Sequence, residues 1–585
     1  MEKRGSMEQH PSASVDRRAL LRTVTAVVTA AAAPAVTAVE AQAQSRLPAT
    51  STVGAKASPV NLVIAASSKG VAETTAGKIR GSSHNGIHSF RGVPYGSPTW
   101  GPARFVQATK PVPWAGVRSS LSFGPICPQG NLGNPAQGDN SAPTDEDQFL
   151  LYRITERQAE DCLRLNVWTP EINGSRKRPV MVWLHGGGFT GHSGSGLLAY
   201  DGHNLARRGD VVVVTSNHRL NMLGYLNLAE AGGEKYATSG NIGMLDIVAM
   251  LEWVRDNISN FGGDPGNVTV FGQSGGGGKV STLMAMSAGK GLFHRAVVQS
   301  GALLRLASFE ESARFGHAFL AELNLSKSGI DKIQTMPLAA LYAASRSAAA
   351  KLGVDSRAPG GSGPAFGFRP VVDGKVIAAH PFDPVAPAVS ANVPLLIGTN
   401  LNEFIHGVDQ PDADSLTNED LLKQFNSRYG TKAQAIVESL RREYPWAKPF
   451  DIFSIAGNRL RETSATQARR KAALGAAPAY VYLFGWQTPM LDGRPRAFHS
   501  CEISFVFNNA DLCVNYSGGT PEALALSRKV SQAWVSFART GDPNHSGLPK
   551  WPPVSEGKLP VMYFDNTCVV RNDPESEARK LMAAG

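Results

Sequence analysis

The sequence is poor in cysteine and has no long run of basic residues. Only 5 of its 585 residues are cysteine, which excludes a small fold held together by a dense set of disulfides. Lys and Arg outnumber Asp and Glu by 58 to 48, giving a net charge of +10, but nowhere do five basic residues follow one another. Nucleic-acid-binding proteins gather such residues into patches, so this scatter predicts no nucleic-acid partner.

Long apolar runs are also scarce, and the one near the N-terminus has the pattern of an export signal. The motif DRRALLR, which begins at Asp16, places two adjacent arginines before an alanine-rich run, and the small residues AQA end at Ala43. This resembles a bacterial twin-arginine signal cleaved after Ala43. The alternative is a membrane anchor, but the run contains Pro34 and ends at Glu40, which makes it a poor spanning helix. We therefore expect an exported protein, periplasmic or extracellular, with no stable membrane anchor in the mature chain.

Composition divides the chain into three parts. Residues 1–43 are the predicted signal, the polar residues 44–58 a linker, and residues 59–585 a single domain. With 42% apolar and 18% charged residues, the chain has the composition of a globular protein that buries a sizeable core.

Short apolar runs alternate with helical patterns along that domain. The runs are typical of strands buried on both faces; they are Val180–Leu184, Val211–Thr215, the stretch NVTVF from Asn267, Pro394–Ile397 and Tyr480–Phe484. Helical spacing covers Met244–Ile258, and Glu310–Leu352 is expected to form a helical cap outside the sheet. This alternation predicts an α/β fold with a large, mostly parallel sheet covered by helices on both faces.

One serine stands within a run of glycines. Residues Gly272 to Gly276 match the pattern G-x-S-x-G around Ser274, with an apolar run before and helical spacing after. That context is required for a nucleophile elbow, in which a sharp strand-to-helix turn exposes the serine hydroxyl. The alternatives are an ordinary tight strand-to-helix turn and a phosphate-binding loop, but Val280 follows Lys279 where such a loop needs Ser or Thr.

A second glycine cluster, HGGGF from His185 to Phe189, follows an earlier strand. Glycines there predict an oxyanion hole, built from the backbone N–H groups of Gly187, Gly188 and Gly275. The alternative is an ordinary glycine loop.

Together these motifs resemble the type-B carboxylesterases of the cholinesterase/lipase family of α/β-hydrolases. The resemblance covers Val71 to Asp565 and rests on FRGVPYG, GPICPQG, EDCLRLNVWTP, NVTVFGQSGGG and FARTGDPN. It implies the α/β-hydrolase fold with a helical cap, and hydrolysis of a small-molecule carboxylic ester through an acyl-enzyme, without metal or cofactor.

The resemblance also implies a catalytic triad. Ser274 is the expected nucleophile, Glu403 in GTNLNEF the acid, and His499 in RAFHSCEISFVF the base. Asp373 is the alternative acid, although its place before Gly374 is typical of a turn. We expect His185 to be a structural histidine.

A disulfide is implied as well. Cys127 and Cys162, 35 residues apart, fall where the family closes a loop over the active site. Such a bridge would stabilise the protein by roughly 4 kcal/mol in the chain-entropy model. Two buried thiols are the alternative. The other three cysteines are odd in number, so at least one is free or pairs between chains.

Departures from the family concern the substrate pocket, which we expect to include Gln273, Phe189 and Phe366. Gln273 stands where the family commonly has Glu, and Tyr152 where cholinesterases have a tryptophan that binds quaternary ammonium. A cationic choline substrate loses both a negative charge and its best cation–π partner. The sequence therefore predicts a serine hydrolase acting on neutral or anionic esters.

Two other functions fit parts of the pattern. The same triad serves amidases, carbamate hydrolases and lipid esterases, because the pocket rather than the acyl-transfer chemistry selects the substrate. Some family members are non-catalytic binding proteins, but these usually lack a triad residue, and this chain has all three.

Overall fold

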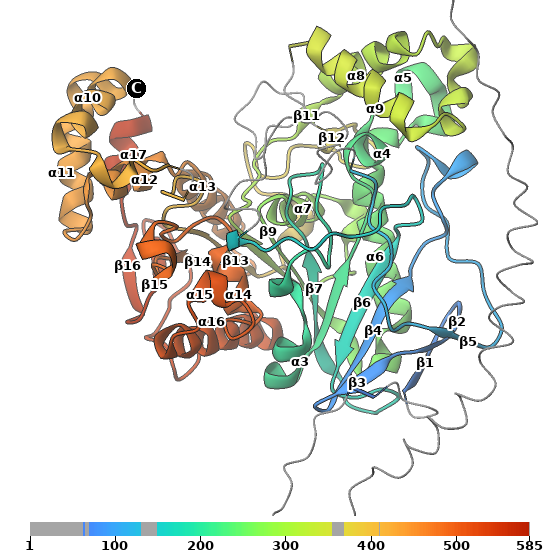
Figure 1. Ribbon diagram of the computed structural model, residues 1–585, viewed down its shortest axis with the longest axis horizontal. Coiled ribbons are helices and arrows are strands. Elements are labelled where there is room, and N and C mark those ends of the chain that lie inside the picture. Colours follow the sequence, from blue (N-terminus) through green and yellow to red (C-terminus); the bar gives the residue numbers. More distant parts are fainter. Residues whose placement is uncertain (1–62, 65–69, 130–148, 354–367, 409, 584–585) are drawn as a thin grey trace, which may run out of the picture. The chain divides into compact units, whose positions relative to one another are not determined.

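Eleven strands form the central sheet of this computed structural model, which describes residues 63–64, 70–129, 149–353, 368–408 and 410–583 (Figure 1). The sheet order is β16-β15-β14-β13-β10-β9-β7-β8-β6-β4-β3. The strands are β3 (Ser82–His84), β4 (Ile87–Pro94), β6 (Arg164–Thr169), β7 (Arg178–Leu184), β8 (Val212–Ser216), β9 (Gly263–Gln273), β10 (Arg295–Gln299), β13 (Leu395–Asn400), β14 (Ala479–Phe484), β15 (Pro560–Phe564) and β16 (Val569–Asn572).

Two small sheets accompany the central one. Their strands are β1 (Val71–Thr74), β2 (Gly77–Arg80) and β5 (Val117–Ser119) in one, and β11 (Ala307–Ser308) and β12 (Val371–Val372) in the other.

The middle of the central sheet is parallel from β15 to β8, and antiparallel pairs occur only toward its two edges among the described strands. The carboxyl ends of the parallel strands therefore meet at one edge, where open α/β sheets place their ligands. The five predicted strands correspond to β7, β8, β9, β13 and β14, with boundaries shifted by a few residues.

The helices lie between the strands in sequence, as predicted. They are α3 (His203–Gly209), α4 (Asn221–Tyr225), α5 (Ala229–Gly232), α6 (Ile242–Asn257), α7 (Gly275–Leu283), α8 (Phe309–Glu322), α9 (Leu338–Lys351), α10 (Asn418–Tyr429), α11 (Ala433–Glu443), α12 (Pro449–Gly457), α13 (Leu460–Ala472), α14 (Cys501–Val506), α15 (Val514–Ser517), α16 (Pro521–Thr540) and α17 (Ser576–Ala583). Helices α8 and α9 pack together at the top of Figure 1 and supply the predicted helical cap.

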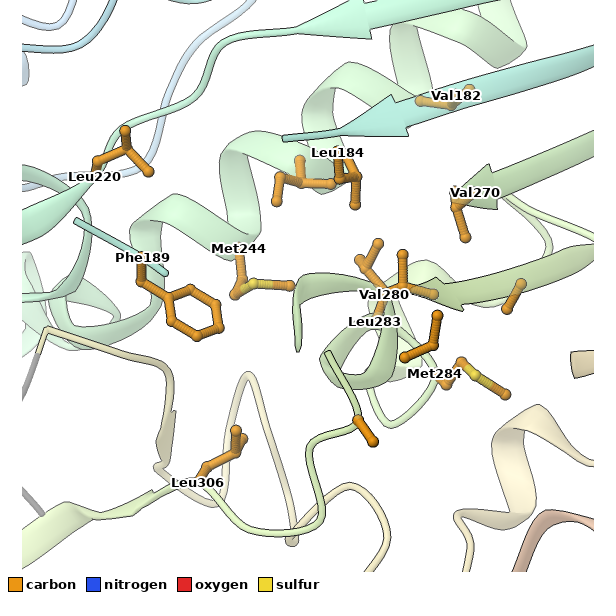
Figure 2. Close-up of a cluster of buried hydrophobic side chains, with 14 of the residues drawn as sticks. Val182, Leu184, Phe189, Leu220, Met244, Val270, Val280, Leu283, Met284 and Leu306 are labelled. Atoms are coloured by element: carbon orange, nitrogen blue, oxygen red, sulfur yellow. The ribbon is translucent and has the colours of Figure 1, made fainter. Parts of the chain in front are cut away.

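Each face of the sheet carries its own hydrophobic core, because side chains alternate along the strands. On β7, Val180, Val182 and Leu184 join one core with residues of α6 and α7, part of which Figure 2 shows. Met181 and Trp183 point the other way and join a second core with α3, α14 and α16. Helices thus cover both faces, which confirms the predicted α/β architecture.

The predicted signal and linker lie outside the described residues. No helix in the part of the chain that the structure describes is long and apolar enough to cross a membrane.

Candidate active site

Ser274 occupies a sharp turn between β9 and α7. Its backbone has φ 56° and ψ −124°, a conformation that costs energy for any residue with a side chain. The turn is held by its neighbours, because the Ser274 N–H donates to the Gln299 carbonyl on β10 at 2.8 Å.

The glycines around Ser274 are required by close backbone contacts. A Cβ atom at Gly276 would lie 1.9 Å from the Leu184 carbonyl oxygen, and one at Gly272 would lie 2.6 Å from the same atom. Only glycine lets β9 and α7 approach β7 this closely. The turn after β9 therefore has the geometry of a nucleophile elbow.

Glu403 and His499 form a buried pair near the ends of β13 and β14. His499 Nδ1 lies 2.5 Å from Glu403 Oε2, and the side chains are almost fully shielded from solvent. The other carboxylate oxygen, Oε1, accepts a hydrogen bond from the Asn400 N–H at 2.8 Å. The backbones are also joined, since the His499 N–H donates to the Glu403 carbonyl at 2.9 Å. The Glu403 carboxylate and the His499 imidazole are therefore fixed relative to each other.

Asp373 does not take part in this pair. Its Oδ1 accepts hydrogen bonds from the N–H groups of Lys375, Val376 and Ile377, at 2.8 to 3.0 Å. It is a turn residue, as its sequence context predicts.

Gln273 lies against the imidazole of His499. Its side chain is 2% exposed, and its Nε2 lies 3.0 Å from His499 Nε2. With Nδ1–H donated to Glu403, Nε2 carries the lone pair, which can accept the Gln273 amide proton. No hydrogen bond joins Ser274 Oγ to His499 among the described residues; the Gln273 amide contacts the His499 ring instead.

Gly187 and Gly188 follow β7 with φ of 80° and 60°, so both need the left-handed conformation that glycine tolerates. Gly188 contacts the elbow, because a Cβ atom at Gly275 would lie 2.1 Å from the Gly188 carbonyl oxygen. The hydrogen bonds among the described residues leave the N–H groups of Gly187, Gly188 and Gly275 unused. The structure thus brings the predicted oxyanion glycines together with free donors.

A second carboxylate, Glu502, lies behind the pair. It is fully buried and accepts hydrogen bonds from Gln299 Nε2 at 3.0 Å and Asn400 Nδ2 at 2.7 Å. Burial and the nearby charge of Glu403 raise the pKa of Glu502 to about 7. The sequence-based predictions did not include Glu502. The only feature that could have pointed to it is its place three residues after His499, on the first turn of α14.

Lys279 on α7 is fully buried as well. Its Nζ donates to the His185 carbonyl oxygen at 2.9 Å, and burial lowers its pKa from 10.5 to about 7. His185 stacks on His218 with ring centroids 4.7 Å apart, and burial lowers the pKa of both imidazoles well below the usual range. His185 is therefore a buried, neutral residue beneath the oxyanion loop rather than a second base.

Replacing Lys279 with methionine is expected to stabilise the protein more at pH 7 than at pH 10. An unfolded lysine keeps its ordinary pKa of 10.5, so between about pH 7 and 10.5 the unfolded chain binds a proton that the folded chain lacks. The free energy of unfolding of the wild-type protein therefore rises with pH in this window, by up to about 1.4 kcal/mol per pH unit, so the buried lysine destabilises the protein most at about pH 7 and below. Urea unfolding of both proteins across this range measures the difference. The exposed Lys290→Met is the control, and a pH-independent difference for Lys279→Met would contradict the prediction.

The residues that the sequence associates with the substrate pocket differ in how far they are buried. Phe189 is buried, with its ring 5.3 Å from that of Tyr225 and at a steep angle to it. Tyr152 is 65% exposed, and Phe366 lies outside the described residues. Phe368, two residues after Phe366, packs edge-on against Phe315 and lies partly buried against the core.

Cys127 and Cys162 are both buried and are free thiols in the structure. They are neighbours, since a hydrogen bond with the Cys127 thiol, together with burial, raises the pKa of Cys162. Cys501, Cys513 and Cys568 are also free thiols. No group of three or more His, Cys, Asp or Glu side chains in the described part of the chain could hold a metal ion.

Known proteins resemble the chain over most of its length. The model of the carboxylesterase family matches residues 68–581. The para-nitrobenzyl esterase of Bacillus subtilis is 35% identical over 512 residues, covering 87% of this chain and 98% of the relative. The phenmedipham hydrolase of Pseudarthrobacter oxydans is 32% identical, covering 82% and 92%.

Solved structures give the same result. An esterase from Clostridium hathewayi that can hydrolyse aliphatic aromatic polyesters superposes with a TM-score of 0.77 at 33% identity, covering 90% of this chain and 99% of that one. Its family is characterised by the Ser-Glu-His triad and by hydrolysis through an acyl-enzyme. The chain therefore belongs to the carboxylesterase family and is a serine esterase of the α/β-hydrolase fold.

Proposed function

We propose that this carboxylesterase uses Ser274 as nucleophile, His499 as base and Glu403 as acid, and that it prefers neutral or anionic esters to cationic ones. The contact of 2.5 Å between His499 Nδ1 and Glu403 Oε2 carries the assignment of the acid and base. It holds the imidazole in the tautomer whose Nε2 can accept a proton.

The reaction follows from these positions. Ser274 Oγ attacks the ester carbonyl carbon while its proton passes to His499 Nε2, and the charge of Glu403 stabilises the imidazolium. The N–H groups of Gly187, Gly188 and Gly275 bind the developing oxyanion, each such donor being worth about 3 kcal/mol in the transition state. The alcohol leaves with the proton from Nε2, and water then hydrolyses the acyl-enzyme by the same steps.

The charges around the base support the preference for neutral or anionic esters. Gln273, 3.0 Å from His499 Nε2, is a neutral amide on the side where the alcohol departs. The guanidinium of Arg153 lies 2.9 Å from His192 Nε2, and His192 contacts Gly187. Burial and the charge of Arg153 lower the pKa of His192 well below its usual range, so Arg153 carries the positive charge there.

Replacing Gln273 with glutamate is expected to shift selectivity toward a cationic ester. One unit charge within several Å in a partly screened cleft is worth on the order of 1–3 kcal/mol, or roughly tenfold or more in specificity. The measurement is the ratio of kcat/KM for a choline ester and a neutral ester of the same acid. That ratio should rise in Gln273→Glu, and the rise should shrink with added salt.

The control for this experiment is Gln434→Glu, which adds the same charge at an exposed site on α11. An unchanged ratio in Gln273→Glu would mean that Gln273 does not face the alcohol side, and the charge argument would fail. A panel of anionic, neutral and cationic esters tests the substrate preference itself.

We also propose that the protein is exported and that Cys127 and Cys162 form a disulfide after export. The adjacent arginines before an apolar run support export, and the contact between the two buried thiols supports the bridge. The twin-arginine route carries folded chains out of a reducing cytoplasm, so the bridge would close only in the oxidising compartment.

Mass spectrometry of unreduced, digested protein from the periplasm or medium is expected to show two products. One is a mature N-terminus that follows Ala43, and the other a peptide that links Cys127 to Cys162. Alkylation of both cysteines as free thiols would refute the bridge, and retention of residues 1–43 would refute the signal.

A further inference from the structure

Phe404 is an exposed aromatic residue in direct contact with the catalytic histidine. Its ring centroid lies 3.9 Å from that of His499, with 32° between the planes. The residue is 49% exposed, whereas Gln273, Glu403 and His499 are all buried. One face of the ring covers the imidazole, and much of the rest is open to solvent.

The backbone around Phe404 is held by hydrogen bonds on both sides. The Glu403 N–H donates to the Ala497 carbonyl at 3.2 Å, and the Gly407 N–H donates to the Arg494 carbonyl at 2.8 Å. Glu403 itself has φ 54°, which turns the chain sharply just before Phe404. The backbone that carries the ring is therefore held on both sides of Phe404.

We propose that Phe404 binds the alcohol part of the substrate and gives the enzyme a preference for esters of aromatic alcohols. This inference rests on the proposed function, because the alcohol departs with the proton that His499 Nε2 delivers. A ring stacked on that imidazole flanks the path of the leaving group. Aromatic rings attract each other in offset or edge-to-face arrangements, beyond the effect of the apolar area that they bury.

A second role of Phe404 would have a different signature. A ring over His499 also stabilises the imidazolium, as aromatic faces do for cations. That effect acts on every ester alike, because every ester needs the same imidazolium. A preference for aromatic alcohols changes only the ratio between substrates, so the two roles can be separated.

The test compares benzyl acetate with ethyl acetate in wild type and in Phe404→Ala. Both esters form the same acetyl-enzyme, so a difference in kcat/KM arises before or as the alcohol leaves. The kcat/KM for benzyl acetate divided by that for ethyl acetate is expected to fall by roughly three- to tenfold in Phe404→Ala. Phe123→Ala is the matched control, since Phe123 is 41% exposed, and its ratio should equal that of wild type.

A second measurement does not depend on how much of the variant is folded. Acetyl-enzyme formed from ethyl acetate partitions between water and added benzyl alcohol, and capture by benzyl alcohol yields benzyl acetate. The ratio of benzyl acetate to acetate is expected to fall by a similar factor in Phe404→Ala.

Equal losses for both esters, with unchanged partitioning, would overturn the proposal and leave Phe404 a residue that positions His499. If wild-type protein hydrolysed neither ester, the proposed function itself would fail, an outcome distinct from an unchanged ratio in an active enzyme.

Discussion

Ser274→Ala is expected to lower turnover to less than about a hundredth of wild type while leaving the fold intact. Removing one triad member usually costs far more than this, because the remaining residues cannot supply another nucleophile. The hydrogen bonds that hold the elbow use the backbone of Ser274, which donates to Gln299 and accepts from Gly278. Alanine keeps that backbone, so urea unfolding should show nearly unchanged stability. Hydrolysis of a short-chain p-nitrophenyl ester gives the activity.

Covalent labelling makes this test independent of the substrate chosen. An organophosphate should add one group to the wild-type protein, at Ser274, and none to Ser274→Ala. The exposed Ser287→Ala is the control and should be labelled like wild type. Residual activity above a hundredth of wild type, or labelling elsewhere, would refute Ser274 as the nucleophile.

Short apolar runs followed by glycine or polar residues were enough to predict β7, β9 and β13 and the residues that follow them. In a parallel sheet the carboxyl ends of such strands meet, so Ser274 and Glu403 could be expected at one edge. His499 could not be located this way, because it comes 15 residues after Phe484, the end of β14. Its assignment needed the family resemblance, and the contact with Glu403 then supported it.

The details of the site depend on segments that are far apart in sequence. Phe404 and His499 are separated by 95 residues, and no local pattern predicts that their rings stack. The Gln273 amide likewise meets His499 only because the end of β9 and the segment after β14 converge. Lys279 is noticeable in the sequence because it is the one charged residue in the apolar helix after the elbow. Its burial, however, follows from the packing of α7 against β7, which the sequence does not show.

Glu403→Gln is expected to lower kcat by several powers of ten without unfolding the protein. The carboxylate accepts two hydrogen bonds, from the Asn400 N–H on Oε1 and from His499 Nδ1 on Oε2. An amide has only one oxygen, so its NH2 group must face one of these donors. If the oxygen turns to Asn400, the NH2 group faces Nδ1 and favours the tautomer in which Nε2 carries a proton and cannot accept one from Ser274. The lost negative charge also leaves the imidazolium without its partner, and together these effects cost roughly 10⁴-fold in comparable triads.

Asp373→Asn is the control: Asn keeps an oxygen for the N–H groups that bind Oδ1, and kcat should stay close to that of wild type. Pre-steady-state hydrolysis of a p-nitrophenyl ester measures both variants, and a larger loss in Asp373→Asn would show that the acid is Asp373.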